Sequence, residues 1–189
     1  MTRFRIAALA ALLVLSTNSI ALAHQGVVHT GCSTGQSFTR GGLTITGAFI
    51  RATPKGAQSA GAYLTVSNAG PDTDTLVGAT SEAASDIAPH VMKMNGTVME
   101  MAAVEGGLAV PAGGTVTLDP MGYHLMMTGM SQQFIEGQCV LMTLHFAKAG
   151  DLPIELNVGS FSQRVPPTGT QTPSSMPPMD MSGMSSMAM

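Results

Sequence analysis

The chain has 189 residues, of which only 10% are charged and none is tryptophan, and its formal net charge is −3. Removal of the first 23 residues, which include Arg3 and Arg5, reduces the eight Lys and Arg to six against eleven Asp and Glu, a net charge of −5. Nucleic-acid binding needs clustered positive charge, so we expect no nucleic-acid partner. A surface with so few charges must consist largely of Ser, Thr, Gly and Asn, which favours a small exported β-protein.

The N-terminal segment, residues 1–23, has the pattern of a secretory signal peptide. Two arginines precede an apolar run over residues 6–15, and the segment ends in the A-x-A sequence 21–23. The run is too short for a good membrane span, although a retained anchor is the alternative. We expect cleavage after Ala23, export to the periplasm and a mature chain that begins at His24.

Three regions follow. Residues 24–41 form a polar N-terminal lead-in, and residues 42–164 carry most of the large apolar side chains that can build a core. Residues 165–189 are low in complexity and rich in methionine, a composition that predicts a flexible, disordered tail.

The middle region consists of short apolar segments separated by Gly- and Pro-containing turns. Strands are expected over residues 43–52, 61–68, 74–81, 89–94, 97–103, 114–120, 122–129, 139–147 and 152–160. This spacing, without a convincing helix, predicts an all-β protein with one antiparallel β-sandwich domain. The two cysteines, Cys32 and Cys139, would most simply form one disulfide in an oxidising compartment, with thiolate metal ligation as the alternative.

Methionine and histidine are concentrated in the stretch HVMKMNGTVMEM, residues 90–101. Asn95-Gly96 is a strong hairpin signal, and a two-residue turn at these positions would pair Met92 with Met99. It would also pair His90 with Met101. Side chains alternate along a strand, so five of these residues would share one face. They are His90, Met92, Met94, Met99 and Met101.

A second group lies at His124 and Met126, which are two residues apart and would therefore point the same way from one strand. If the two strands are neighbours, two histidines and two methionines could converge on one ion. Soft thioether sulfur selects Cu(I), whereas zinc prefers thiolate, imidazole and carboxylate. The donor set therefore favours Cu(I).

The other methionines of this region have a simpler interpretation, because methionine usually fills gaps in a core. Core packing is expected for Met94, Met99, Met127, Met130 and Met142. His145 alternates with apolar neighbours on its strand, which predicts a solvent-facing side chain.

The pattern His90-x10-Met101-x22-His124-x-Met126 resembles the PCu(A)C family of periplasmic copper chaperones. Supporting segments lie at 51–70, 103–130 and 143–151, and the resemblance covers about residues 44–160. It implies a cupredoxin-like β-sandwich that binds Cu(I) through two His and two Met and delivers it during assembly of the copper centres of cytochrome c oxidase. These four residues would then be the ligands, and Met92 could assist or replace one of them.

Two further copper sites are conceivable at the ends of the mature chain. The tail carries Met176, Met179, Met181, Met184, Met187 and Met189, without His or Cys. These thioethers could bind a second Cu(I), or the tail could simply be solvated. At the other end, the α-amine and imidazole of His24, with His29 nearby, would favour Cu(II).

We therefore expect a monomeric copper-delivery protein that is not an enzyme, with a copper-accepting oxidase subunit or assembly protein as its partner. One alternative is a blue-copper electron carrier that uses Cys139 and His145, although no methionine follows closely to serve as the axial ligand. A copper-dependent oxidative enzyme built on His24 and a β-sandwich adhesion module without copper are the others.

Overall fold

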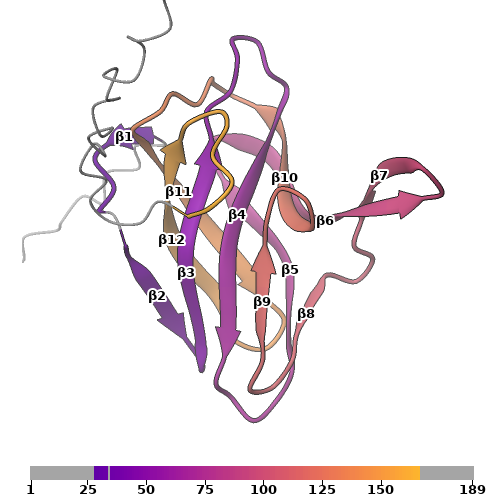
Figure 1. Ribbon diagram of the computed structural model, residues 1–189. Coiled ribbons are helices and arrows are strands. Elements are labelled where there is room, and N and C mark those ends of the chain that lie inside the picture. The colour runs from indigo at the N-terminus through magenta and orange to yellow at the C-terminus, as the bar shows by residue number, and fades with distance from the viewer. Residues whose placement is uncertain (1–27, 34, 167–189) are drawn as a thin grey trace, which may run out of the picture.

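The computed structural model describes residues 28–33 and 35–166, which form strands joined by turns (Figure 1). The expected signal peptide, His24 and the six tail methionines lie outside the described residues. Within the described part there is no helix long and apolar enough to span a membrane. The strands are β1 Val28–Thr30, β2 Ser37–Arg40, β3 Leu43–Arg51, β4 Ser59–Asn68, β5 Asp74–Ser81, β6 Ala84–Asn95, β7 Val98–Ala103, β8 Leu108–Val110, β9 Thr115–Leu118, β10 Tyr123–Met130, β11 Gln138–Phe146 and β12 Gly150–Gly159.

The strands form one continuous sheet that closes on itself. The ring runs β11, β12, β3, β4, β10, β6 and β5, and β5 pairs again with β11. Each pair in the ring is antiparallel except β3 with β12, which is parallel. The all-β prediction is confirmed, and the two layers expected of a sandwich are joined here by hydrogen-bonded strands at both edges.

The core lies inside this ring because alternate residues of each strand point inward. The largest fully buried side chains come from all parts of the ring, and burial of each contributes about 1.5–3 kcal/mol. They are Phe49, Phe134, Leu43, Ile45, Ile50, Leu64, Leu76, Leu125, Met127, Leu144, Ile154 and Leu156.

The expected core methionines divide into two groups. Met127 and Met142 are buried and Met130 packs partly buried against the core, as predicted. The prediction was wrong for Met94 and Met99, which are 62% and 44% exposed. The reason is that the β6–β7 hairpin projects away from the ring (Figure 1), so the end of the hairpin has no facing layer in this part of the structure.

The polar lead-in contains two strands that the sequence pattern did not reveal. β1 pairs with β11 and β2 pairs with β3, so both are held at the periphery by partners rather than by an apolar face of their own. A disulfide joins Cys32 to Cys139 of β11, with the two Cα atoms 5.1 Å apart. This crosslink fastens the N-terminal segment to the ring.

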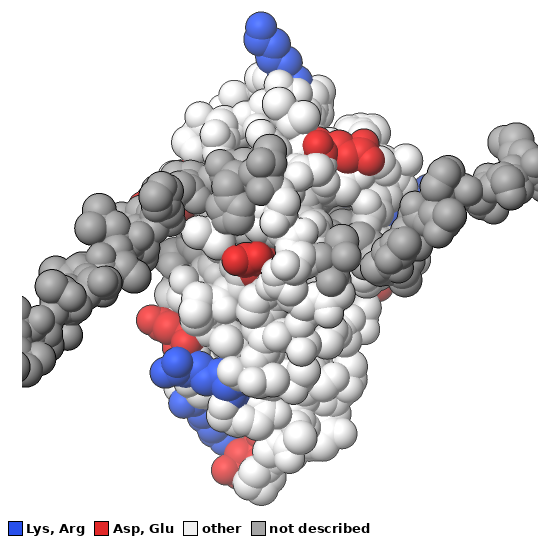
Figure 2. Space-filling view, turned by 90° about the vertical axis from the view of Figure 1, so that its left-hand side faces the viewer, with Lys and Arg blue, Asp and Glu red and all other residues white. Residues whose placement is uncertain are grey.

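Charges are sparse on the face seen in Figure 2, as the composition suggests. The blue and red side chains occur singly or in small mixed groups, and the parts not covered by grey atoms show no broad positive patch. On this face the described residues therefore offer no surface suited to a nucleic-acid backbone.

Candidate metal centre

The sheet brings the two sequence-predicted histidines together. β6 lies between β10 and β7, and His90 of β6 stands directly opposite His124 of β10. Their ring centroids are 6.1 Å apart and the ring planes differ by 28°. Metal–imidazole bonds are about 2.0 Å long, so both rings can reach one ion between them after small rotations.

Backbone carbonyls orient both rings in the same way. His90 Nδ1 lies 3.2 Å from the Ala88 carbonyl oxygen, and His124 Nδ1 lies 3.3 Å from the Gly122 carbonyl oxygen. A carbonyl oxygen can only accept, so each Nδ1 must carry the hydrogen and donate it. The lone pair of each Nε2 is then free for a metal, the arrangement that fixes metal-binding histidines in proteins generally.

A turn before β10 holds the Gly122 carbonyl in place. Asp119 Oδ1 accepts the Met121 N–H at 2.8 Å, and the Asp119 carbonyl accepts the Gly122 N–H at 3.3 Å. The Gly122 carbonyl also accepts the Met92 N–H at 3.1 Å, which ties β6 to this turn. Sequence reasoning missed these groups, and the available signal was the Asp-Pro-x-Gly turn two residues before His124.

The electrostatics of the pair favour neutral imidazole. His124 is only 5% exposed, and this burial is the main reason why its pKa lies below the usual histidine value. His90 also lowers the pKa, whereas the Gly122 carbonyl and Asp119 act in the opposite direction. Neutral imidazole is the form that binds metal, so His124 is prepared for ligation near neutral pH.

The hairpin register predicted for residues 90–101 was wrong by two residues. Gly96 and Thr97 form the two-residue turn, with Gly96 at a φ of +64°, which is the glycine-first order of a type II′ turn. Met92 therefore faces Met101, and His90 faces an alanine. A shift of two residues preserves the side-chain alternation, so the expected face is unchanged.

The methionines of the predicted ligand set lie diagonally from His90. Met101 on β7 is opposite Met92, and Met126 on β10 is opposite Ala88, two residues before His90. Diagonal neighbours on adjacent strands are about 7–8 Å apart at Cα, a span that long side chains can bridge. The topology thus arranges His124, Met101 and Met126 around His90 on the outward face of three adjacent strands.

Small residues flank Met126 on both neighbouring strands. Its partners are Ala88 on β6 and Gly61 on β4. A Cβ at Gly61 would collide with the Tyr63 hydroxyl, so the rigid phenol ring depends on glycine at this position. Burial is the main factor that raises the Tyr63 pKa, against the lowering effect of Arg51, whose guanidinium carbon lies 5.5 Å from the ring centroid.

The donor set is partly open to solvent. Met101 is 48% exposed, Met126 and His90 are half-buried, and His124 is buried. Two imidazoles and two thioethers are all uncharged donors, and the soft sulfur atoms suit Cu(I). This arrangement can hold a soft monovalent cation at a position that another molecule can approach.

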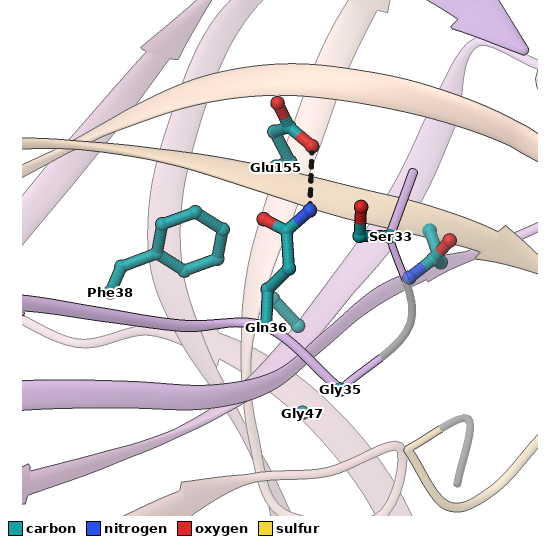
Figure 3. Close-up of a pocket in the computed structure, with 8 residues that line it drawn as sticks. Ser33, Gly35, Gln36, Phe38, Gly47 and Glu155 are labelled. Carbon is teal, nitrogen blue, oxygen red and sulfur yellow. Dashed lines mark hydrogen bonds between the residues drawn. The ribbon is translucent and has the colours of Figure 1, made fainter. Parts of the chain in front are cut away.

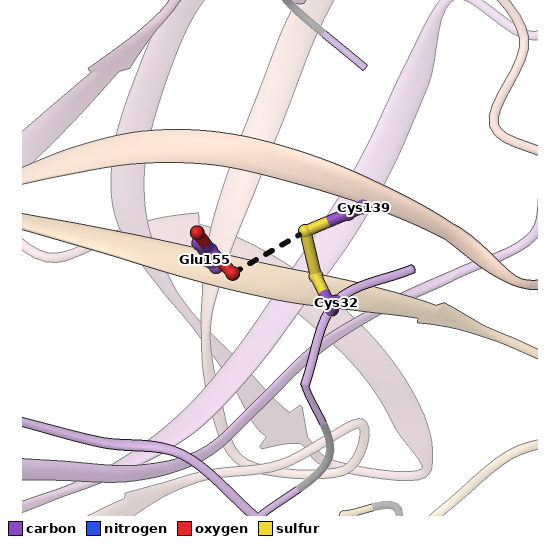
Figure 4. A group of neighbouring side chains, drawn as sticks. All are labelled: Cys32, Cys139 and Glu155. Atoms are coloured by element: carbon purple, nitrogen blue, oxygen red, sulfur yellow. Dashed lines mark hydrogen bonds between the residues drawn. A yellow bond between two sulfur atoms is a disulfide. The ribbon is translucent and has the colours of Figure 1, made fainter. Parts of the chain in front are cut away.

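A different group of potential ligands lies at the other end of β11. Cys32, Cys139 and Glu155 bring one donor atom each within 4.8 Å of the others (Figure 4). Glu155 Oε2 is 3.8 Å from the Cys139 sulfur. Both sulfur atoms are engaged in the disulfide, so neither is available as a thiolate.

The same disulfide weakens the blue-copper alternative. Cys139 and His145 are six residues apart on β11, which is about 20 Å along an extended strand and too far for a shared ion. His145 Nδ1 pairs with Asp151 Oδ1 at 2.7 Å, and its Nε2 lies 3.0 Å from the Thr80 hydroxyl. Both ring nitrogens of the partly exposed His145 are thus occupied by protein groups.

A small pocket lies beside the disulfide (Figure 3). In it, Gln36 Nε2 donates to Glu155 Oε2 at 3.0 Å. The cavity volume is about 20 Å³, enough for about one water molecule, so it cannot hold an organic ligand. The lining residues are Ser33, Gly35, Gln36, Phe38, Gly47, Ala48, Glu155 and Asn157.

Solved structures with a similar fold are PCuAC domains. The copper-bound PCuAC domain from PmoF2 is 26% identical with a TM-score of 0.57, and the match covers 66% of this chain and 98% of that domain. The structure of CuI-DR1885 from Deinococcus radiodurans is 27% identical with a TM-score of 0.51, over 66% of this chain and 80% of that one. The resemblance to PCu(A)C proteins seen in the sequence is thereby confirmed.

The family model that matches this chain is described as "Putative lipoprotein LpqE-like" and covers residues 43–158. The chain therefore belongs to the LpqE-like family. A curated relative, "Putative lipoprotein Lxx21020" of Leifsonia xyli subsp. xyli, is 32% identical over 121 residues, which are 64% of this chain and 72% of that protein.

Proposed function

We propose that the protein is a Cu(I) chaperone that binds one ion through His90, Met101, His124 and Met126, with Met92 as an assisting ligand. The observation that carries the proposal is the opposed histidine pair, in which carbonyl acceptors leave both Nε2 atoms free while two thioethers lie on the diagonals. The similarity to a copper-bound PCuAC domain and to CuI-DR1885 supports it.

Ligand exchange is the mechanism that this geometry favours. The buried His124 anchors the ion, whereas the exposed Met101 is the ligand that a partner can displace first. A thioether carries no proton and no charge, so its departure leaves nothing to neutralise. A stronger thiolate or histidine site on the partner would then take the ion without a change in its oxidation state.

We propose the periplasm as the place of action and a copper-accepting oxidase subunit or assembly protein, in the assembly of cytochrome c oxidase, as the recipient. The signal-like residues 1–23 support export, as does the word lipoprotein in the names of the family and the relative. The protein would act as a monomer and would not be an enzyme. The tail methionines, with a second Cu(I), and His24, with Cu(II), are candidates for secondary sites.

Cu(I) affinity, measured by competition with a chromophoric chelator, tests the main site. The mature chain and a form that ends at Arg164 should both hold one tightly bound ion. In the shorter form, His124→Ala with Met126→Ala should weaken binding at least 100-fold, since loss of outer residues alone costs 10–100-fold at metal sites. The matched control is His145→Ala, a histidine on the same sheet that should leave affinity unchanged. Equal affinity of all forms would exclude this ligand set.

A further inference from the structure

The β6–β7 hairpin carries more thioethers than the proposed ligand set uses. Two methionine pairs are directly opposed across it, Met92 with Met101 and Met94 with Met99. All four lie on the same face as His90, because opposed and alternate residues of a strand pair share a face. The pairs therefore form a continuous row of sulfur donors from the hairpin turn to the histidines.

Packing does not account for this row. Met94, Met99 and Met101 are 62%, 44% and 48% exposed, although methionine is ordinarily used to fill gaps in cores. The opposite face of the same hairpin carries the cross-strand pair Lys93 and Glu100, a composition usual for solvent. One face of an exposed hairpin is thus selectively thioether.

The spacing of the row suits a shared soft ion. Opposed residues have Cβ atoms about 4.5–5.5 Å apart. Residues two apart on one strand are separated by about 6.6 Å. Methionine side chains have three flexible torsions, so the sulfur atoms of adjacent pairs can turn toward one point above the sheet.

We propose that Met94 and Met99, with Met92, form a second Cu(I) site at the hairpin tip, which receives incoming Cu(I) and passes it through Met101 to the histidine pair. The receiving site rests on the donor geometry of the hairpin alone, whereas the passage to the histidines rests on the proposed function. Each step exchanges one neutral sulfur donor for another, and the ion stays Cu(I), so no electron or proton is transferred. The direction follows from the donors, because the histidine pair adds two imidazoles to the thioethers.

A residue-specific measurement separates this site from the tail methionines. The mature chain with ¹³C-labelled methionine methyl groups is titrated with Cu(I) under reducing, oxygen-free conditions. We expect the Met101 and Met126 methyl signals to shift with the first equivalent, and those of Met94 and Met99 to shift together with further Cu(I). If the Met94 and Met99 signals stay in place up to three equivalents, the receiving site is excluded.

Two sets of variants complete the test. In His90→Ala with His124→Ala the Met94 and Met99 signals should still shift, so failure of the histidine site does not conceal the tip site. Met94→Leu with Met99→Leu should leave first-ion affinity within twofold and slow its transfer from a chelator at least fivefold. The control, Met130→Leu, removes a thioether at the far end of β10 and should leave the rate unchanged. An unchanged rate in the double leucine variant would overturn the passage step.

Discussion

The crosslink between Cys32 and Cys139 should contribute a large share of the stability of this domain without any role in copper binding. The disulfide closes a loop with a sequence separation of 107 residues. Loss of loop entropy in the unfolded chain then stabilises the folded state by about 4.8 kcal/mol at 25 °C. That is a substantial part of the 5–15 kcal/mol typical of a whole domain.

The copper site should be unaffected because it lies at the other end of the ring. Leu144 of β11 is level with Ile87 of β6, through their common partner Ala79 on β5. From this level Cys139 is five residues away in one direction and His90 is three residues away in the other. Eight residues of extended strand correspond to roughly 26 Å.

Urea unfolding of the copper-free protein measures the effect. Cys32→Ala with Cys139→Ala should lower the free energy of unfolding by about 3–5 kcal/mol and raise the m-value, since the unfolded chain becomes less compact. Chemically reduced wild type is the control, because it keeps both sulfur atoms and loses only the crosslink. The alanine variant should retain wild-type Cu(I) affinity. A loss of stability under 1 kcal/mol would refute the loop-entropy reasoning, and a loss of tight Cu(I) binding would refute the separation of the two regions.

Three further results are expected. Burial tends to raise the pKa of Asp74, but the backbone N–H groups of three residues and the charge of Lys148 outweigh it and hold the pKa below 3.8. Its stabilising effect should therefore be complete above about pH 4–5 and be lost as the pH falls below 3.8, so the stability gap between wild type and Asp74→Asn, about 1.5–3 kcal/mol in urea unfolding at pH 6, should narrow at pH 3. Gly61→Ala should destabilise the fold by about 1–3 kcal/mol through collision with the Tyr63 hydroxyl, and Tyr63→Phe in the same chain should recover part of it; no recovery would assign the strain elsewhere. Met92→Leu should weaken Cu(I) binding less than tenfold in chelator competition, and a larger loss would make it an obligatory ligand.

Local sequence patterns were sufficient for much of the fold and for the composition of the candidate site. Period-two alternation and regularly spaced turn residues identify most strands of the ring, because those strands bury one face and expose the other. The same alternation predicts which side chains share a face of the β6–β7 hairpin. That prediction survives the error in register, because a shift of two residues returns each side chain to its original face.

Other features depended on partners remote in the chain. β1 and β2 are polar and exist as strands because β11 and β3 pair with them. The core prediction for Met94 and Met99 failed because exposure depends on whether another layer covers a strand, which its own pattern does not report. The turn at Gly96 and Thr97 was missed since two adjacent two-residue turns were both compatible with the sequence.

The sequence by itself determined which donors are present, on which strand faces they stand and that their softness suits Cu(I). Only the tertiary structure decided that β6 and β10 are neighbours, which sets His90 opposite His124. It also decided that two carbonyls turn both Nε2 atoms toward the same side. Side-chain direction is a local property of the chain, whereas strand pairing depends on closure of the whole ring around its core.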